Sequence, residues 1–119
     1  MKHMRISQLS DIADGQVFQE IMPGKYIKNG ALSYAKPGAR SHSHPGEPRD
    51  HHTHDDIETF IVIQGKGKLE LDGKFYDMIP GDIYAVEPGE DHHIISSEDD
   101  PTVVMWIHAG DERSKKHFE

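Results

Sequence analysis

The chain has 119 residues, which is enough for one hydrophobic core, so we expect a single domain. Its formal net charge of −8 argues against binding to nucleic acid or to an anionic membrane surface, because both carry negative charge. With no cysteine, the chain can form neither a disulfide framework nor a thiolate metal site.

The first residues contain no apolar segment of the kind found in a signal peptide, and no apolar run in the sequence is long enough to span a bilayer. We therefore expect a cytoplasmic protein with no membrane association.

The N-terminal third predicts strands followed by a loop. We expect QVFQEIM (16–22) to form a strand. Residues 23–38 predict two further short strands joined by a turn at Asn29-Gly30, a dipeptide typical of hairpins. Residues 39–50 contain two prolines and almost no apolar side chain, which predicts a loop.

From residue 58 onward, short apolar segments alternate with turn sequences, of which the hairpin dipeptide Asp72-Gly73 is the clearest. Short strands at close spacing, with no convincing helix between them, are typical of a β-sandwich or a small barrel. We expect strands at ETFIVI (58–63), KLEL (68–71), KFYDMI (74–79), IYAV (83–86), HHIIS (92–96) and TVVMWIH (102–108).

The predicted class is therefore all-β, with one domain over residues 16–110. We expect residues 1–15 to form an N-terminal arm, and the charged residues 111–119 to form a frayed tail.

A cluster of histidines and a glutamate stands just before the predicted strand 58–63. On an extended chain, side chains two residues apart share a face, so His52, His54 and Glu58 point the same way. A helix would bring only His54 and Glu58 together, and the residues that follow favour a strand. Imidazole and carboxylate are good ligands for first-row divalent metals. The best candidate for a fourth ligand is His92, which begins a predicted strand that could lie beside the first.

The other histidines of this region have a simpler interpretation. Histidines in a polar loop are often only solvated, and we interpret His42, His44 and His51 in this way. His42 and His44 have the same His-x-His spacing, but Pro48 stands where a glutamate would be needed. The pair could cover the site at the mouth of a barrel or have no role.

The sequence from residue 46 onward resembles the first motif of the cupin family. That motif consists of a glycine, five residues, His-x-His, three residues, a glutamate, six residues and a second glycine. Every spacing is matched by Gly46, His52, His54, Glu58 and Gly65.

The second cupin motif is also matched, with two departures. Gly81, Gly89 and His92 stand at the spacing of that motif, whereas Glu87 occupies the usual position of a proline and Ser96 that of an asparagine. Neither departure replaces a metal ligand.

The resemblance to the cupins implies a single antiparallel β-barrel or jelly roll, the double-stranded β-helix. It also implies a homodimer, to which Val17–Met22 could contribute by crossing to the partner, and dimerisation would cover exposed strand edges. Carried over residue by residue, the implied ligands of one divalent transition metal (Mn, Fe, Zn, Ni or Cu) are His52, His54, Glu58 and His92.

Three imidazoles and one carboxylate leave about two positions open on a six-coordinate metal, and open positions are typical of working sites. We expect a metal-dependent enzyme that acts on a small polar organic molecule, of the dioxygenase, decarboxylase, isomerase or lyase type. The alternative is a non-catalytic module that binds a small ligand or a sugar. The complete ligand set favours the enzyme, although no general acid or base beyond the ligands stands out.

Alternate residues of each strand should line the pocket of such a barrel. In the last strand we expect Trp106 and His108 to face the pocket, although core packing is the simpler interpretation of Trp106. Tyr34, Lys36 and Arg40 lead to the mouth, where one of them could bind a substrate carboxylate. An exposed polar face is again the simpler interpretation.

Overall fold

The structure, a computed structural model, describes residues 1, 3, 5, 15–17, 27–42 and 52–109. These residues form eight strands and no helix, and among them there is accordingly no helix that could cross a membrane. The strands are β1 (Gly15–Val17), β2 (Ile27–Tyr34), β3 (Glu58–Gln64), β4 (Gly67–Leu71), β5 (Lys74–Met78), β6 (Ile83–Val86), β7 (His92–Ser96) and β8 (Val103–Ala109).

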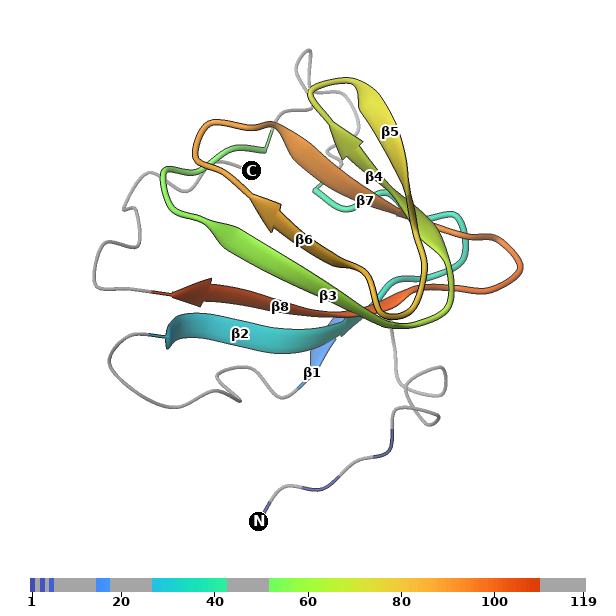
Figure 1. Cartoon of the computed structure of the whole chain (residues 1–119). Coiled ribbons are helices and arrows are strands. Elements are labelled where there is room, and N and C mark those ends of the chain that lie inside the picture. The colour runs from blue at the N-terminus through green and yellow to red at the C-terminus, as the bar shows by residue number, and fades with distance from the viewer. Residues whose placement is uncertain (2, 4, 6–14, 18–26, 43–51, 110–119) are drawn as a thin grey trace.

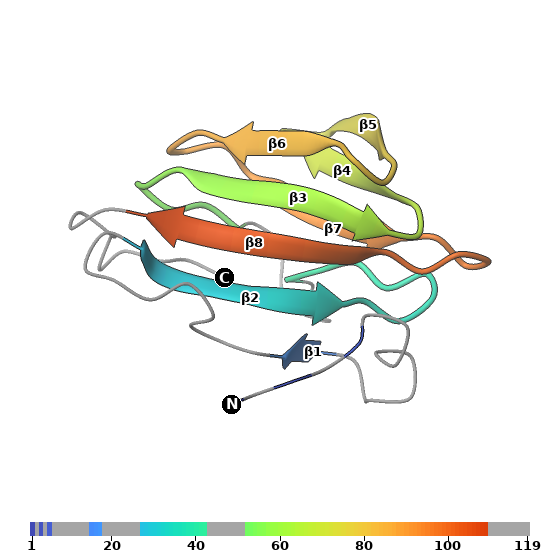
Figure 2. The same ribbon diagram turned by 60° about the horizontal axis from the view of Figure 1, so that its bottom comes forward.

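The strands form two antiparallel sheets. The larger sheet has the order β1-β2-β8-β3-β6, and Figure 2 shows these five strands one below another. The smaller sheet has the order β5-β4-β7, and Figure 1 shows it as a second layer beside β6 and β3. Among the described strands no backbone ladder joins one sheet to the other, so the two sheets form a jelly roll rather than a closed barrel.

The core lies between the two sheets and follows from the alternation of side chains along the strands. In β3 the buried positions are Glu58, Phe60 and Val62, which share one face of the strand. Each fully buried large apolar side chain stabilises the fold by roughly 1.5–3 kcal/mol. The inner face of β3 is therefore apolar along most of its length and polar at its first residue. The apolar core cluster consists of Phe60, Val62, Leu69, Met78, Val86, Ile94 and Val104.

Local turn chemistry accounts for the hairpin between β4 and β5. Asp72 and Gly73 both have positive φ, 47° and 82°, as a two-residue type I′ turn requires. The side chain of Asp72 also accepts a hydrogen bond of 3.0 Å from the backbone N–H of Asp91. The turn predicted here from the sequence is confirmed.

The predicted turn at Asn29-Gly30 is wrong. Both residues lie inside β2, which runs without a break and pairs with β8. In this ladder Asn29 faces His108, Gly30 faces Ile107, and the register shifts next to Asn29. Pairing with a long neighbouring strand outweighs the preference of this dipeptide for a turn, which is only a local signal.

Candidate metal centre

The fold brings His52, His54, Glu58 and His92 to one end of the space between the sheets. Glu58 is the first residue of β3, and His92 is the first residue of β7. The prediction that the strand of His92 could lie beside the Glu58 strand is wrong, because β7 pairs with β4 in the other sheet. The two segments are instead joined just before β3, where His92 N–H donates to the His52 carbonyl at 3.2 Å.

The four side chains are buried and close together. Their exposed fractions lie between 1% and 5%. One ligand atom from each can be chosen so that all four lie within 4.8 Å of one another. The Oε1 atom of Glu58 is 3.0 Å from Nε2 of His54 and 3.1 Å from Nε2 of His92. The ring of His52 completes the group, with its centroid 4.7 Å from that of His92.

This arrangement fits a first-row divalent metal ion. Ligands at about 2.1 Å from a metal, at right angles to each other, lie about 3.0 Å apart, which is the separation found around Glu58 Oε1. The Nδ1 atoms of His54 and His92 face backbone carbonyls of Asp56 and Glu90, at 3.0 and 2.9 Å. Metal-binding histidines usually donate their second ring N–H in this way, which leaves Nε2 for the metal.

The electrostatics of the site favour a cation. Burial alone would raise the pKa of Glu58, but hydrogen bonds from His108, His54 and His92 outweigh it and hold that pKa well below the ordinary 4.5. Burial would lower the pKa of His54, but contacts with Glu58 and Asp56 raise it above 6.5. Glu58 is therefore a carboxylate, and the raised pKa of His54 favours a positively charged imidazole beside it in the metal-free site.

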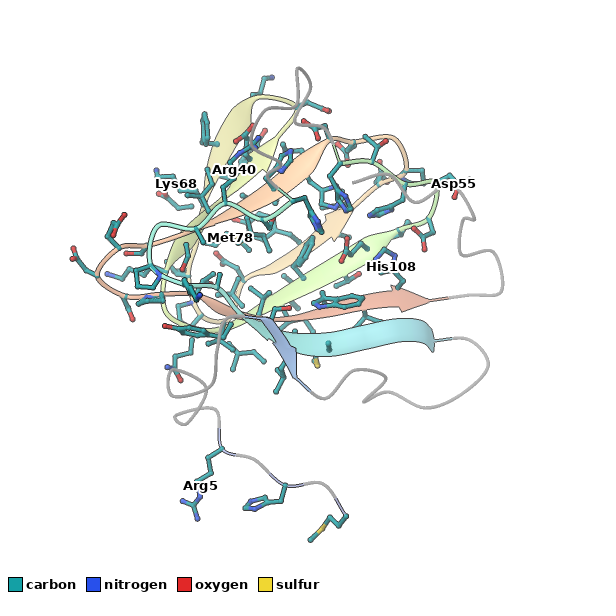
Figure 3. The ribbon with its side chains drawn as sticks, turned by 180° about the vertical axis from the view of Figure 1, so that it is seen from behind. Arg5, Arg40, Asp55, Lys68, Met78 and His108 are labelled. Carbon is teal, nitrogen blue, oxygen red and sulfur yellow. The ribbon has the colours of Figure 1, made fainter. Side chains whose placement is uncertain are left out.

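Two further buried residues extend the cluster. His108 lies opposite Glu58 in the ladder between β8 and β3, and Figure 3 shows it near the end of β8. The prediction that His108 faces the site is confirmed. Asp56 is not among the predicted site residues, although its position two residues from both His54 and Glu58 places it on the same face of an extended chain.

His42 is not the solvated loop residue that the sequence predicts. Its ring is half-buried and stacks on that of His52, with centroids 3.6 Å apart and an interplanar angle of 10°. Its φ is 54°, an uncommon value for a residue other than glycine. His44 and His51 lie outside the described residues.

The residues considered for the pocket mouth mostly follow the simpler interpretation. Arg40 binds both carboxylate oxygens of Glu70 at 3.0 Å, and this ion pair lowers the pKa of Glu70. Lys36 is exposed and Tyr34 is half-buried. Trp106 packs against the apolar core and donates to the hydroxyl of Ser33, which confirms core packing.

The two departures from the second motif lie outside the four-residue cluster, Ser96 at the end of β7 and Glu87 just after β6. Ser96 accepts a hydrogen bond from the N–H of Thr102 at 2.9 Å and donates to the carbonyl of Ala35 at 3.1 Å. Glu87 opens the turn before β7, in which its N–H donates to the side chain of Glu90. Ser96 therefore links the end of β7 to the segments after β2 and before β8, whereas Glu87 stabilises a turn.

Comparison with known proteins supports the same fold. The family model described as "Cupin domain" matches residues 35–108, which is more than half of the chain. A search of curated proteins found no match.

Solved structures with the same fold are distant in sequence. A cupin protein from Bacteroides fragilis is 18% identical with a TM-score of 0.66, and the match covers 98% of this chain and 90% of that one. A Cupin 2 conserved barrel domain protein from Salinispora arenicola is 17% identical with a TM-score of 0.64, over 91% and 87% of the two chains. A variant of oxalate decarboxylase from Bacillus subtilis is 18% identical with a TM-score of 0.61, over 77% and 23%.

Proposed function

Since this chain belongs to the cupin family, we propose that it binds one divalent transition metal and uses it as an enzyme on a small polar organic molecule. The observation that supports this proposal is the convergence of three imidazoles and one carboxylate, all buried, from the segment that leads into β3, from β3 itself and from β7 of the other sheet. The proposed ligands are His52, His54, Glu58 and His92.

The donor set limits the metal without selecting one. Nitrogen and carboxylate oxygen ligands suit Mn, Fe, Ni, Cu and Zn, whereas the softest sites would need sulfur ligands. A bound ion of this kind would act as a Lewis acid that polarises a carbonyl or carboxylate oxygen of the substrate. The remaining work falls to the chain, which keeps water away by burying the four side chains and fixes the Nε2 atoms of His54 and His92 through their Nδ1 contacts.

The proposed reaction is of the dioxygenase, decarboxylase, isomerase or lyase type. The four-ligand set leaves about two positions for substrate on a six-coordinate ion. A complete set of ligands around open positions is expected of a working site more than of a purely structural one. The competing function is a non-catalytic module that binds a small ligand or a sugar at the same ion.

A ligand screen separates these functions. The chain is loaded with Mn²⁺, Fe²⁺, Ni²⁺, Cu²⁺ or Zn²⁺, or stripped with a chelator, and melted in the presence of sugars, small organic acids and amino-acid derivatives. We expect at least one compound to raise the melting temperature of a loaded form only, because it binds through the ion. Metal-dependent turnover of that compound supports the enzyme, and binding without turnover supports the alternative.

We also propose a homodimer. The edge strands β5 and β6 expose large apolar side chains, among them Phe75 at 58% and Ile83 at 67%. Association of two copies would cover such edges. The segment suggested to cross to the partner, Val17–Met22, lies mostly outside the described residues. Light scattering of the purified chain should give twice the mass of one chain, and a monomeric mass would refute this proposal.

A further inference from the structure

Asp56 and His108 are buried beside the proposed metal centre without belonging to the four-ligand set. Their exposed fractions are 7% and 1%. A buried carboxylate and a buried imidazole are unfavourable unless other polar groups satisfy them. The polar contacts of these two residues lead to two of the proposed ligands, Glu58 and His54.

The contacts form a closed ring of four side chains. Asp56 lies between two imidazoles, with Oδ1 2.8 Å from Nδ1 of His54 and Oδ2 2.9 Å from Nδ1 of His108. The other nitrogen of His108, Nε2, is 3.3 Å from Oε2 of Glu58. The ring closes between Glu58 Oε1 and His54 Nε2 at 3.0 Å, the two atoms that are positioned to bind the metal.

The ring assigns a separate role to each oxygen of Glu58. Oε1 faces the Nε2 atoms of His54 and His92, whereas Oε2 faces His108. A carboxylate can bind a metal through one oxygen or through both. Contact with His108 occupies Oε2, so Glu58 would bind through Oε1 alone and leave a further position open.

The same ring of four side-chain contacts determines which imidazole nitrogen His54 offers to a metal. The backbone carbonyl of Asp56 accepts from Nδ1 at 3.0 Å, and the carboxylate oxygen Oδ1 of Asp56 lies 2.8 Å from the same nitrogen as an ion-pair contact. Because these oxygens can only accept, Nδ1 carries the proton and Nε2 remains for the metal.

The backbone fixes the partners of this ring. Glu58 and His108 are direct partners in the antiparallel ladder of β3 and β8. Their side chains therefore meet on the inner face of one sheet, and Asp56 contacts His108 and His54 from the segment that leads into β3.

We infer that Asp56 and His108 are positioning residues that bridge His54 and Glu58 and hold Glu58 in one-oxygen coordination. This inference rests on the proposed metal centre. The three residues His54, Asp56 and His108 are also close enough to hold an ion themselves. The ring accounts for their contacts without an ion, so the inference predicts one metal per chain rather than two.

The test uses the full chain loaded with Cu²⁺, whose electron paramagnetic resonance spectrum reports the ligands directly. His108→Leu removes both contacts of the imidazole. We expect its affinity for Cu²⁺, measured against a competing chelator, to fall about 10–100-fold, with an altered spectrum. His108→Gln retains an amide that can donate to Glu58, and it should recover most of the affinity and the spectrum of the unmodified chain.

Trp106→Phe is the matched control. Trp106 precedes His108 by two residues on the same strand and lies opposite Phe60 in the same ladder, but its hydrogen bond goes to Ser33. Its substitution should leave the affinity and spectrum unchanged. Asp56→Asn, which preserves the shape of the side chain, provides a second test if His108→Leu does not fold, and it should weaken Cu²⁺ binding about 10-fold.

The possible failures are distinguishable. Normal Cu²⁺ binding with an unchanged affinity and spectrum in His108→Leu or Asp56→Asn would overturn the positioning role and leave the proposed metal centre intact. Two ions per unmodified chain would overturn the role as well, because the ring would then be a second metal site. An unmodified chain that binds no metal would overturn both proposals.

Discussion

His92 and His93 are adjacent buried histidines that point to opposite faces of β7. Nε2 of His92 lies 3.1 Å from the Glu58 carboxylate. His93 instead contacts the side chain of Asp91 and the carbonyl of Ser41, at 3.1 and 2.8 Å. Strand alternation thus separates a proposed ligand from a structural histidine of the same type and burial.

This pair gives a sharp test of the ligand assignment. His92→Asn should lower metal affinity by more than the roughly 10–100-fold that the loss of a ligand's hydrogen-bonding partner costs, because it removes a ligand outright. His93→Asn should keep its metal and lose about 1–3 kcal/mol of unfolding free energy through its unsatisfied partners. Metal analysis and denaturant unfolding of both variants measure the two quantities. Equal metal loss in the two variants would show that the face assignment is wrong.

At the level of single elements, the turn after β3 requires a glycine for two separate reasons. Gly65 has a φ of 77°, and a Cβ atom at this position would overlap the backbone carbonyl oxygen of Pro101. The next residue, Lys66, donates its N–H to the carbonyl of Asp100 at 2.7 Å. The glycine that ends the first motif therefore lets the loop before β8 pack directly on the end of β3.

Gly73 allows the two reasons to be measured separately. Its φ is 82°, similar to that of Gly65, but a Cβ there would meet nothing within 4 Å. Gly73→Ala should cost about 1 kcal/mol of unfolding free energy, from the left-handed backbone alone. Gly65→Ala should cost roughly 3 kcal/mol or more, because steric overlap is added. Similar losses in the two variants, measured by denaturant unfolding, would contradict this account of the β3 turn.

Local signals explain which elements could be predicted from the sequence. The strands from β3 to β8 were expected within a residue or two of their observed ends, because alternating apolar residues and turn dipeptides such as Asp72-Gly73 act over short distances. The continuous strand through Asn29-Gly30 was not expected, because it depends on pairing with β8, far along the chain.

The candidate metal centre also has a part that local sequence patterns predict and a part that depends on strand pairing. His52, His54 and Glu58 could be grouped from their spacing, since alternation shows which side chains share a face. Alternation does not show which strands pair, so neither the placement of His92 in the other sheet nor the contact of Asp56 with His108 could be predicted. These contacts depend on strand register, which the sequence pattern of one strand does not contain.

For the whole molecule, protons and metal compete for the same buried cluster. The raised pKa of His54 means that its proton stabilises the metal-free fold below pH 6.5, and this stabilisation is lost as the pH rises through the folded-state pKa. Glu58 acts in the opposite sense. Its lowered pKa stabilises the fold above pH 4.5, and this contribution disappears as the pH falls through the folded-state value.

Metal binding reverses the preference of His54, because a ligand imidazole must be neutral. The rise in melting temperature that Zn²⁺ or Ni²⁺ produces should therefore shrink as the pH falls from about 8 to about 5.5. Melting curves of loaded and chelated protein across this range measure the difference. A metal-dependent rise that is constant or grows toward acid pH would contradict the proposed histidine ligands.

The most direct measurement is anomalous diffraction from crystals of the metal-loaded chain, recorded at the absorption edge of the bound ion. We predict a single anomalous peak per chain, within bonding distance of about 2.0–2.3 Å of one atom from each of His52, His54, Glu58 and His92. A peak bonded to other side chains, or fully loaded crystals with no peak between the two sheets, would contradict the account.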